Sequence, residues 1–207
     1  VALNVVDLAH ELGRHIEVLI DETAETESRL RATDLRVANS MVPWVDDDQL
    51  DVTIAIGDNF WRQSVYERLR PRVCGERFAN LVHPEATVSH YAKLGIGSIL
   101  LAGSRIGPGA ALGDFPYINV NAVVAHECTL GDFVSMSPGA ALAGRVKVGT
   151  RSSLGMNSSV RERCIISDDV IVGANSFVNF DTPAGCILGG VPAKVLRDRH
   201  PGERYLR

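Results

Sequence analysis

An aliphatic residue recurs at every sixth position of this chain from Val88 to Val178. Stepping by six gives sixteen positions that are all aliphatic or Met: Val88, Leu94, Leu100, Ile106, Leu112, Ile118, Val124, Leu130, Met136, Leu142, Val148, Leu154, Val160, Ile166, Val172 and Val178. The residue four places after each of them is nearly always small, and no insertion interrupts the series. Internal repeats of this regularity restrict the chain to few architectures.

A period of six excludes both an amphipathic helix, which repeats every 3.6 residues, and a flat strand, which alternates. It fits a triangular coil with three six-residue sides, in which the aliphatic side chain fills the interior and the small residue fits inside the corner. Gly often follows the aliphatic residue, as at Gly95 and Gly113, and we expect it to permit the turn. Coils of this kind stack as parallel strands about 4.8 Å apart. The repeat therefore predicts a left-handed parallel β-helix over 84–187.

The residues before the repeat have a different pattern. Residues 1–12 predict a helix that ends at Gly13, and Asn59 is expected to cap a second helix that runs to about Leu69. Apolar runs at 16–20, 52–56 and 77–82 predict strands. Strands alternating with helices indicate a small parallel α/β domain, here a Rossmann-like domain over 1–83. Because such a domain begins with a strand and a Gly-rich loop, we expect both to precede Val1 in the intact protein.

Composition narrows the possible functions. The net charge of −4 argues against a nucleic-acid partner, which needs a concentrated basic face. No run approaches the roughly 18 apolar residues of a membrane helix, so we expect no membrane insertion. The four cysteines form no regular framework, which favours reduced thiols in a cytoplasm, with Cys128 and Cys164 packed in the corners. Residues 188–207 are expected to form a terminal cap and tail.

Residues eighteen apart should lie one above the other on successive coils. His126 and Gly144 form such a pair, and together they offer a general base and a backbone N–H that could stabilise an oxyanion. The adjacent carboxylate of Glu127 would raise the basicity of the imidazole, and Asn119 could orient the acetyl group or the acceptor. A single exposed His is more often structural, so the spacing alone leaves both interpretations open.

A second column, with Met156 and Ala174, predicts a groove for an extended cofactor arm. The basic tail that begins at Lys194 could contact phosphates or could be a solvated cap. Asp21 ends a predicted strand, which suits a ribose or base contact and suits a solvated loop acid equally well.

Several segments resemble the PglD/NeuD family of bacterial hexapeptide-repeat acyltransferases. They are IAIGDNFWRQSVYERL, FANLVHPEATVS, VNAVVAHECTLGDF, SPGAALAGRVKVG, LGMNSSV and the closing GGVPAKV. The resemblance implies a Rossmann-like domain that binds a nucleotide-sugar, a left-handed β-helix, and a homotrimer in the bacterial cytoplasm with the site between subunits. It also implies transfer of acetyl from acetyl-CoA to the amine of a nucleotide-linked 4-amino-sugar of the bacillosamine type, without a metal.

The same resemblance assigns roles to individual residues. The implied catalytic residues are His126 as general base, Glu127 and Gly144. The implied acetyl-CoA contacts are Ser135, Gly144, Met156, Gly173, Ala174 and Lys194. The implied substrate contacts are Asp21, Glu22, Gly57, Asn59 and Asn119. Ser135 stands where the family often carries a second His, and Asp58 replaces a more usual Asn.

Three other functions could use the same coiled fold. Transfer to a hydroxyl of sialic acid or a related sugar keeps the chemistry and changes only the acceptor. A non-catalytic scaffold would use the coils only to form a trimer. A zinc hydrase would need about three His ligands, whereas the repeats hold only His90 and His126, two coils apart. We reject the zinc site within one subunit.

Overall fold

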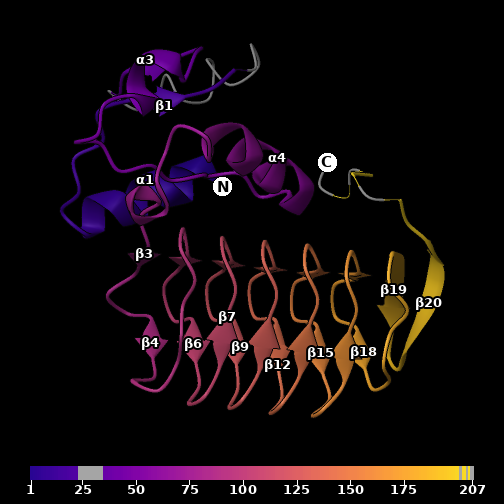
Figure 1. Ribbon diagram of the computed structural model, residues 1–207. Helices are drawn as coiled ribbons and strands as arrows, with labels where there is room; N and C mark the ends of the chain where they lie inside the picture. Colours follow the sequence, from indigo (N-terminus) through magenta and orange to yellow (C-terminus); the bar gives the residue numbers. More distant parts are fainter. Residues whose placement is uncertain (23–34, 201, 204, 206–207) are drawn as a thin grey trace.

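The computed structural model describes residues 1–22, 35–200, 202–203 and 205, and its larger part is a stack of three-sided coils (Figure 1). The four central coils, from β5 to β16, each contribute one short strand to each of three sheets, which are named here by their number of strands. The eight-stranded sheet has the order β20-β19-β17-β14-β11-β8-β5-β3, the six-stranded sheet β18-β15-β12-β9-β6-β4, and the four-stranded sheet β16-β13-β10-β7. Pairs such as Leu130↔Val148 are parallel and eighteen residues apart, which confirms the predicted coil length.

The strand bounds follow the repeat. They are β3 (Leu81–Val82), β4 (Thr87–Val88), β5 (Ile99–Leu100), β6 (Arg105–Ile106), β7 (Ala111–Leu112), β8 (Tyr117–Ile118), β9 (Val123–Val124), β10 (Thr129–Leu130), β11 (Ser135–Met136), β12 (Ala141–Leu142), β13 (Lys147–Val148), β14 (Ser153–Leu154), β15 (Ser159–Val160), β16 (Ile165–Ile166), β17 (Ile171–Val172), β18 (Phe177–Val178), β19 (Cys186–Gly190) and β20 (Ala193–Asp198). All pair in parallel except β20, which returns antiparallel along β19.

The interior of the stack is filled as the repeat predicts. The aliphatic positions from Leu100 to Val178 are all at most 5% exposed, while Val88 and Leu94 at the open end are partly buried against the same core. Cys128 and Cys164 occupy buried corners, as expected, and all four cysteines are free thiols. Interdigitation of large and small side chains thus gives one continuous apolar core.

The expected role of the glycines is wrong. From Gly97 to Asn175, the left-handed backbone of the turns falls three residues after the aliphatic position, at Gly103 and Gly109 and equally at side-chain-bearing residues such as Phe115. The Gly that directly follows the aliphatic residue has no positive φ, but a Cβ on Gly95 would lie 2.2 Å from the carbonyl oxygen of Gly113. This glycine therefore allows successive coils to approach closely.

The N-terminal region consists of α1 (Ala2–Glu11), β1 (Leu19–Ile20), β2 (Val37–Ala38), α3 (Val42–Val45), α4 (Asn59–Leu69) and the 3₁₀-helix η1 (Gly75–Arg77). Gly13 follows α1 with φ +64°, the left-handed conformation with which a glycine commonly ends a helix. β1 and β2 pair in parallel, whereas the run at 52–56 contributes only a bridge from Val52 to Phe78. The cap of α4 is Asp58, which accepts the Trp61 N–H, rather than Asn59.

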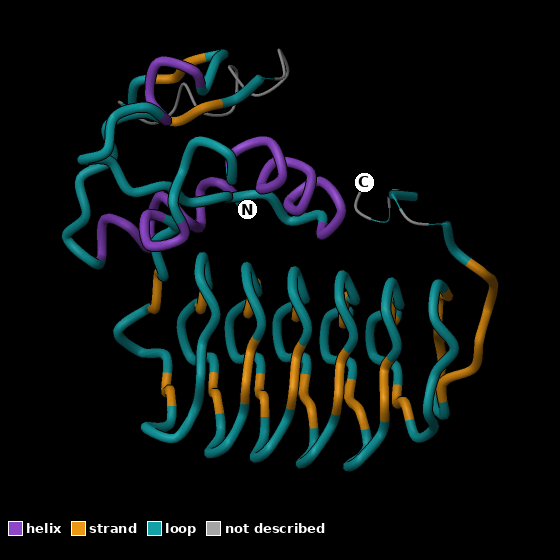
Figure 2. The backbone as a smooth tube through the Cα atoms, in the orientation of Figure 1, coloured by secondary structure: helices purple, strands orange, loops and turns teal. Residues whose placement is uncertain are grey.

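Helices α1 and α4 lie along one side of the stack, over the eight-stranded sheet (Figure 2). Val5 and Leu8 of α1 pack in one cluster with Ile99, Leu101 and Tyr117. Arg62 of α4 is buried and donates to the carbonyls of Phe115 and Phe133, and burial lowers its pKa to about 10. One side of the prism is therefore covered. No described helix is long and apolar enough to cross a membrane.

Candidate functional site

His126 and Glu127 lie at the corner between β9 and β10, where the six-stranded sheet meets the four-stranded sheet. Glu127 takes the left-handed corner position with φ 57°. Its Oε2 lies 3.0 Å from Nδ1 of His126, and both side chains are about half exposed, at 53% and 54%. An ionised carboxylate can only accept, so this bond places the imidazole proton on Nδ1 and leaves Nε2 as the free base atom.

The ring of His126 rests on Gly144, one coil further along. A Cβ built on Gly144 would lie 2.3 Å from Nε2 of His126, so no side chain fits there while the ring keeps its place. Among the described residues, no carbonyl or side chain accepts the Gly144 N–H. The structure thus brings together the two groups that the sequence paired, a free imidazole nitrogen and an available amide donor.

Arg145 is a member of this group that sequence reasoning missed. Its Nε lies 3.0 Å and its Nη2 2.9 Å from Oε2 of Glu127, the same oxygen that accepts from His126. The hydrogen bond from His126, followed by the bond and the charge of Arg145, lowers the pKa of the Glu127 carboxyl. Because Arg145 follows Glu127 by eighteen residues, the arithmetic that paired His126 with Gly144 could have found it.

The predicted cofactor column lies at a different corner. Met156 and Ala174 are exposed where the eight-stranded sheet meets the six-stranded sheet, and Asn119 and Gly173 belong to the same corner. Every strand of the six-stranded sheet begins at this corner and ends at the corner of His126. Within one chain, the base and the cofactor column are therefore separated by the width of that sheet.

Two residues predicted to contact ligands are instead buried within the protein. Ser135 is 7% exposed beneath α4, and its hydroxyl donates to Oδ1 of Asn59 over 2.6 Å. Asn59 is 1% exposed and donates to the carbonyls of Arg151 and Ser152. Their polar atoms hold α4 on the coils, and the roles of Ser135 toward the cofactor and of Asn59 toward the substrate stay predictions.

The other predicted substrate residues lie in the N-terminal region. Asp21 directly follows β1, and its N–H donates to the Ala38 carbonyl. Glu22 forms an ion pair with Arg68 of α4, at 2.8 Å. The Gly57 carbonyl accepts from Arg62. This region covers the eight-stranded sheet, on the side of the prism opposite the corner of His126, so one chain does not bring the two sets together.

The basic tail is only partly available to a ligand. Lys194 on β20 is exposed, as a contact to phosphates would require. Arg199 is 5% exposed, lies 3.9 Å from the carboxylate of Asp169 and stacks its guanidinium over Tyr205. Residues 201, 204, 206 and 207 of the predicted tail lie outside the described residues.

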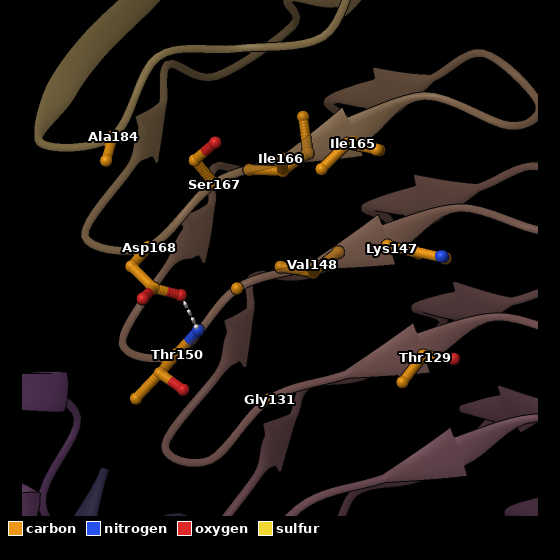
Figure 3. Close-up of a pocket in the computed structure, with 11 residues that line it drawn as sticks. Thr129, Gly131, Lys147, Val148, Thr150, Ile165, Ile166, Ser167, Asp168 and Ala184 are labelled. Carbon is orange, nitrogen blue, oxygen red and sulfur yellow. Dashed lines mark hydrogen bonds between the residues drawn. The ribbon is translucent and has the colours of Figure 1, made fainter.

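An open hollow lies on the outer face of the four-stranded sheet (Figure 3). Its lining includes Thr129, Lys147 and Ile165 from successive strands, and at one end Asp168 accepts the Thr150 N–H over 2.7 Å. Thr129 follows His126 by three residues, so the hollow begins at the edge where the His126 corner lies. No feature of the repeat predicted this hollow.

Several solved structures are similar to the chain over nearly its whole length. The acetyltransferase domain of PglB from Neisseria gonorrhoeae is 30% identical, with 94% of each chain covered and a TM-score of 0.83, and it has also been solved with acetyl coenzyme A. PerB from Caulobacter crescentus, solved with CoA and GDP-perosamine, is 33% identical, with 94% of this chain and 91% of that chain covered and a TM-score of 0.84.

A variant of perosamine N-acetyltransferase from the same organism, with one histidine replaced by asparagine, is 32% identical. It covers 95% of this chain and 92% of its own, with a TM-score of 0.86. No family model and no curated protein matches the chain. Identities of 30% or more over more than nine-tenths of both chains, together with the coil repeat, show which family the protein belongs to. The chain belongs to the hexapeptide-repeat family of acetyl-CoA-dependent sugar N-acetyltransferases.

Proposed function

We propose that this protein transfers the acetyl group of acetyl-CoA to the amine of a nucleotide-linked amino sugar. The observation that carries the proposal is the free Nε2 of His126 resting directly on Gly144, whose amide has no partner among the described residues. A related enzyme, PerB, was solved with CoA and GDP-perosamine, which supports an acceptor of this class.

Each group has one task in the reaction. Nε2 of His126 takes a proton from the acceptor amine as its nitrogen attacks the thioester carbonyl carbon. The Gly144 N–H donates to the carbonyl oxygen as negative charge develops on it. The C–S bond then breaks, and CoA leaves as a thiolate that can accept the proton from the imidazolium. Glu127 stabilises that imidazolium through its bond to Nδ1.

We place the complete site between copies of the chain in a homotrimer of left-handed coils. The support is geometric, because His126 lies at one corner while Met156 and Ala174 lie at the other edge of the six-stranded sheet. A neighbouring copy would supply the cofactor corner, and a Rossmann-like N-terminal region with Asp21 and Gly57 would supply the nucleotide contacts. The parallel pairing of β1 with β2 agrees with such a region.

A thiol-release assay tests the activity. Wild-type protein and His126→Ala are given acetyl-CoA with UDP-, dTDP- and GDP-4-amino-sugars and with sialic acid. We expect CoA release with one amino sugar, and a loss of about 10²-fold or more in kcat for the variant. Release with sialic acid alone would move the assignment to O-acetylation, and no release with any acceptor would favour a scaffold.

A further inference from the structure

We propose that Arg145 is a positioning residue for the general base, acting through Glu127. The inference rests on the proposed function and names a residue that the reaction would need. Three donors converge on one oxygen, because Oε2 of Glu127 accepts from Nδ1 of His126 and from Nε and Nη2 of Arg145, all within 3.0 Å. The other oxygen of Glu127 has no partner among the described residues.

The convergence matters because the carboxylate is otherwise poorly held. Glu127 is 54% exposed, and a Cβ built on Gly109, one coil earlier, would come within 3.3 Å of its Cγ. An exposed glutamate would normally sample several rotamers. The guanidinium of Arg145 selects the rotamer in which Oε2 reaches His126.

The rotamer of Glu127 in turn fixes the ring of His126. The bond to Nδ1 determines which nitrogen carries the proton and which way the ring faces, so that Nε2 lies over Gly144 as a free base. Arg145 itself follows Gly144 directly and shares its left-handed corner with φ 64°. Its side chain therefore begins next to Gly144, which the His126 ring contacts, and extends to the carboxylate of Glu127.

A purely structural role for Arg145 is disfavoured by its exposure. The Arg145 side chain is 49% exposed, and ion pairs between exposed groups contribute little to folding. We therefore expect Arg145→Gln to unfold at the wild-type temperature while its kcat falls about tenfold, because small displacements of a base are costly in rate. The KM for acetyl-CoA and for the acceptor should stay within about twofold of wild type.

The test measures kcat and KM for wild type, Arg145→Gln, Arg145→Lys, Glu127→Gln and the double variant Arg145→Gln/Glu127→Gln. Lysine supplies the charge with one point of contact, so partial rescue is expected. If Arg145 acts through Glu127, the double variant should be no slower than Glu127→Gln alone. Arg163→Gln is the matched control, because Arg163 lies one coil beyond Arg145 in the same column and has no bond to Glu127; its activity should be unchanged.

Two outcomes would overturn the inference while leaving the proposed function intact. In one, the wild type is active and Arg145→Gln has the same kcat. In the other, the variant raises KM with unchanged kcat, which would make Arg145 a substrate contact. Absence of wild-type activity with every acceptor would instead count against the proposed function itself.

Discussion

At the scale of single residues, the position of the base depends on the absence of a side chain. His126 has no rigid wall around it, since about half of its side chain is exposed, and its ring is supported from below by Gly144. A methyl group at Gly144 would occupy the space of Nε2. The imidazole would then have to turn away from the Gly144 N–H.

We predict that Gly144→Ala lowers kcat by about 10²-fold, because displacing a catalytic group by about 1 Å costs a factor of that order. The melting temperature should change little, since the ring can move into solvent. Steady-state kinetics and circular dichroism measure the two effects. Gly75→Ala is the control, because a Cβ there meets Ile96 at an ordinary 3.7 Å. Full activity of Gly144→Ala would contradict the observed contact.

The pairing of His126 with Gly144 could be predicted because eighteen-residue columns follow from the repeat, while the catalytic roles of His126, Glu127 and Gly144 came from the family resemblance. Ser135 and Asn59 could not be judged in the same way. The repeat gives three equivalent sides, and nothing in it says which side α4 covers. Ser135 falls on the covered side, so a polar residue that looked like a ligand contact became an internal hydrogen-bond partner.

At the scale of elements, α4 is attached to the coils by polar groups as well as by aromatic packing. The Arg62 guanidinium donates to four main-chain carbonyls and to the Ser135 hydroxyl, with no carboxylate among these partners. The bonds to the Phe115 and Phe133 carbonyls are buried, and they satisfy acceptors that would otherwise lack a donor. Removing either the guanidinium or its acceptors leaves the other group buried without a hydrogen-bond partner, which lowers the stability of the fold.

Arg62→Leu should reduce the free energy of unfolding by about 3 kcal/mol, because it leaves the Phe115 and Phe133 carbonyls without donors. Urea unfolding at one fixed protein concentration measures the change. The comparison is Arg70→Leu, which removes an exposed pair with Glu67 and should cost about 0.5 kcal/mol or less. Equal losses for the two variants would show that the buried bonds add nothing.

The coils were predictable element by element because each position of the repeat has one environment in every coil. The run at 52–56 was not, since strand formation also needs a neighbour. Val52 bridges to Phe78, while Ile54 is buried in the cluster with Val73 and Phe78. The run is apolar because it packs against these residues, and apolar packing alone does not produce a ladder of backbone bonds.

At the scale of the whole molecule, the predicted functional residues are distributed over different corners of one prism. The helices cover the eight-stranded sheet, and none of the described helices covers the six- or the four-stranded sheet (Figure 1). A symmetric assembly of such prisms brings the corner of one copy against the side of the next.

Mixing two inactive variants tests whether the site is shared. His126→Ala lacks the base, and Ala174→Trp should block the exposed cofactor column. If each site takes its base from one copy and its groove from another, co-expression in equal amounts should restore about a quarter of wild-type activity, because one site in four is intact. Each variant expressed alone is the control. No recovery in mixed trimers would place the whole site within one chain.

The fixed length of the coil also limits how such a protein can diversify. His126 and Gly144 meet only because eighteen residues separate them, and the same interval aligns every strand pair from β5 to β17. A one-residue insertion within that stretch would shift every residue after it by one position, so that residues of one column would no longer lie above each other. The register is therefore kept only when a whole coil is added or when the extra residues are extruded at a corner.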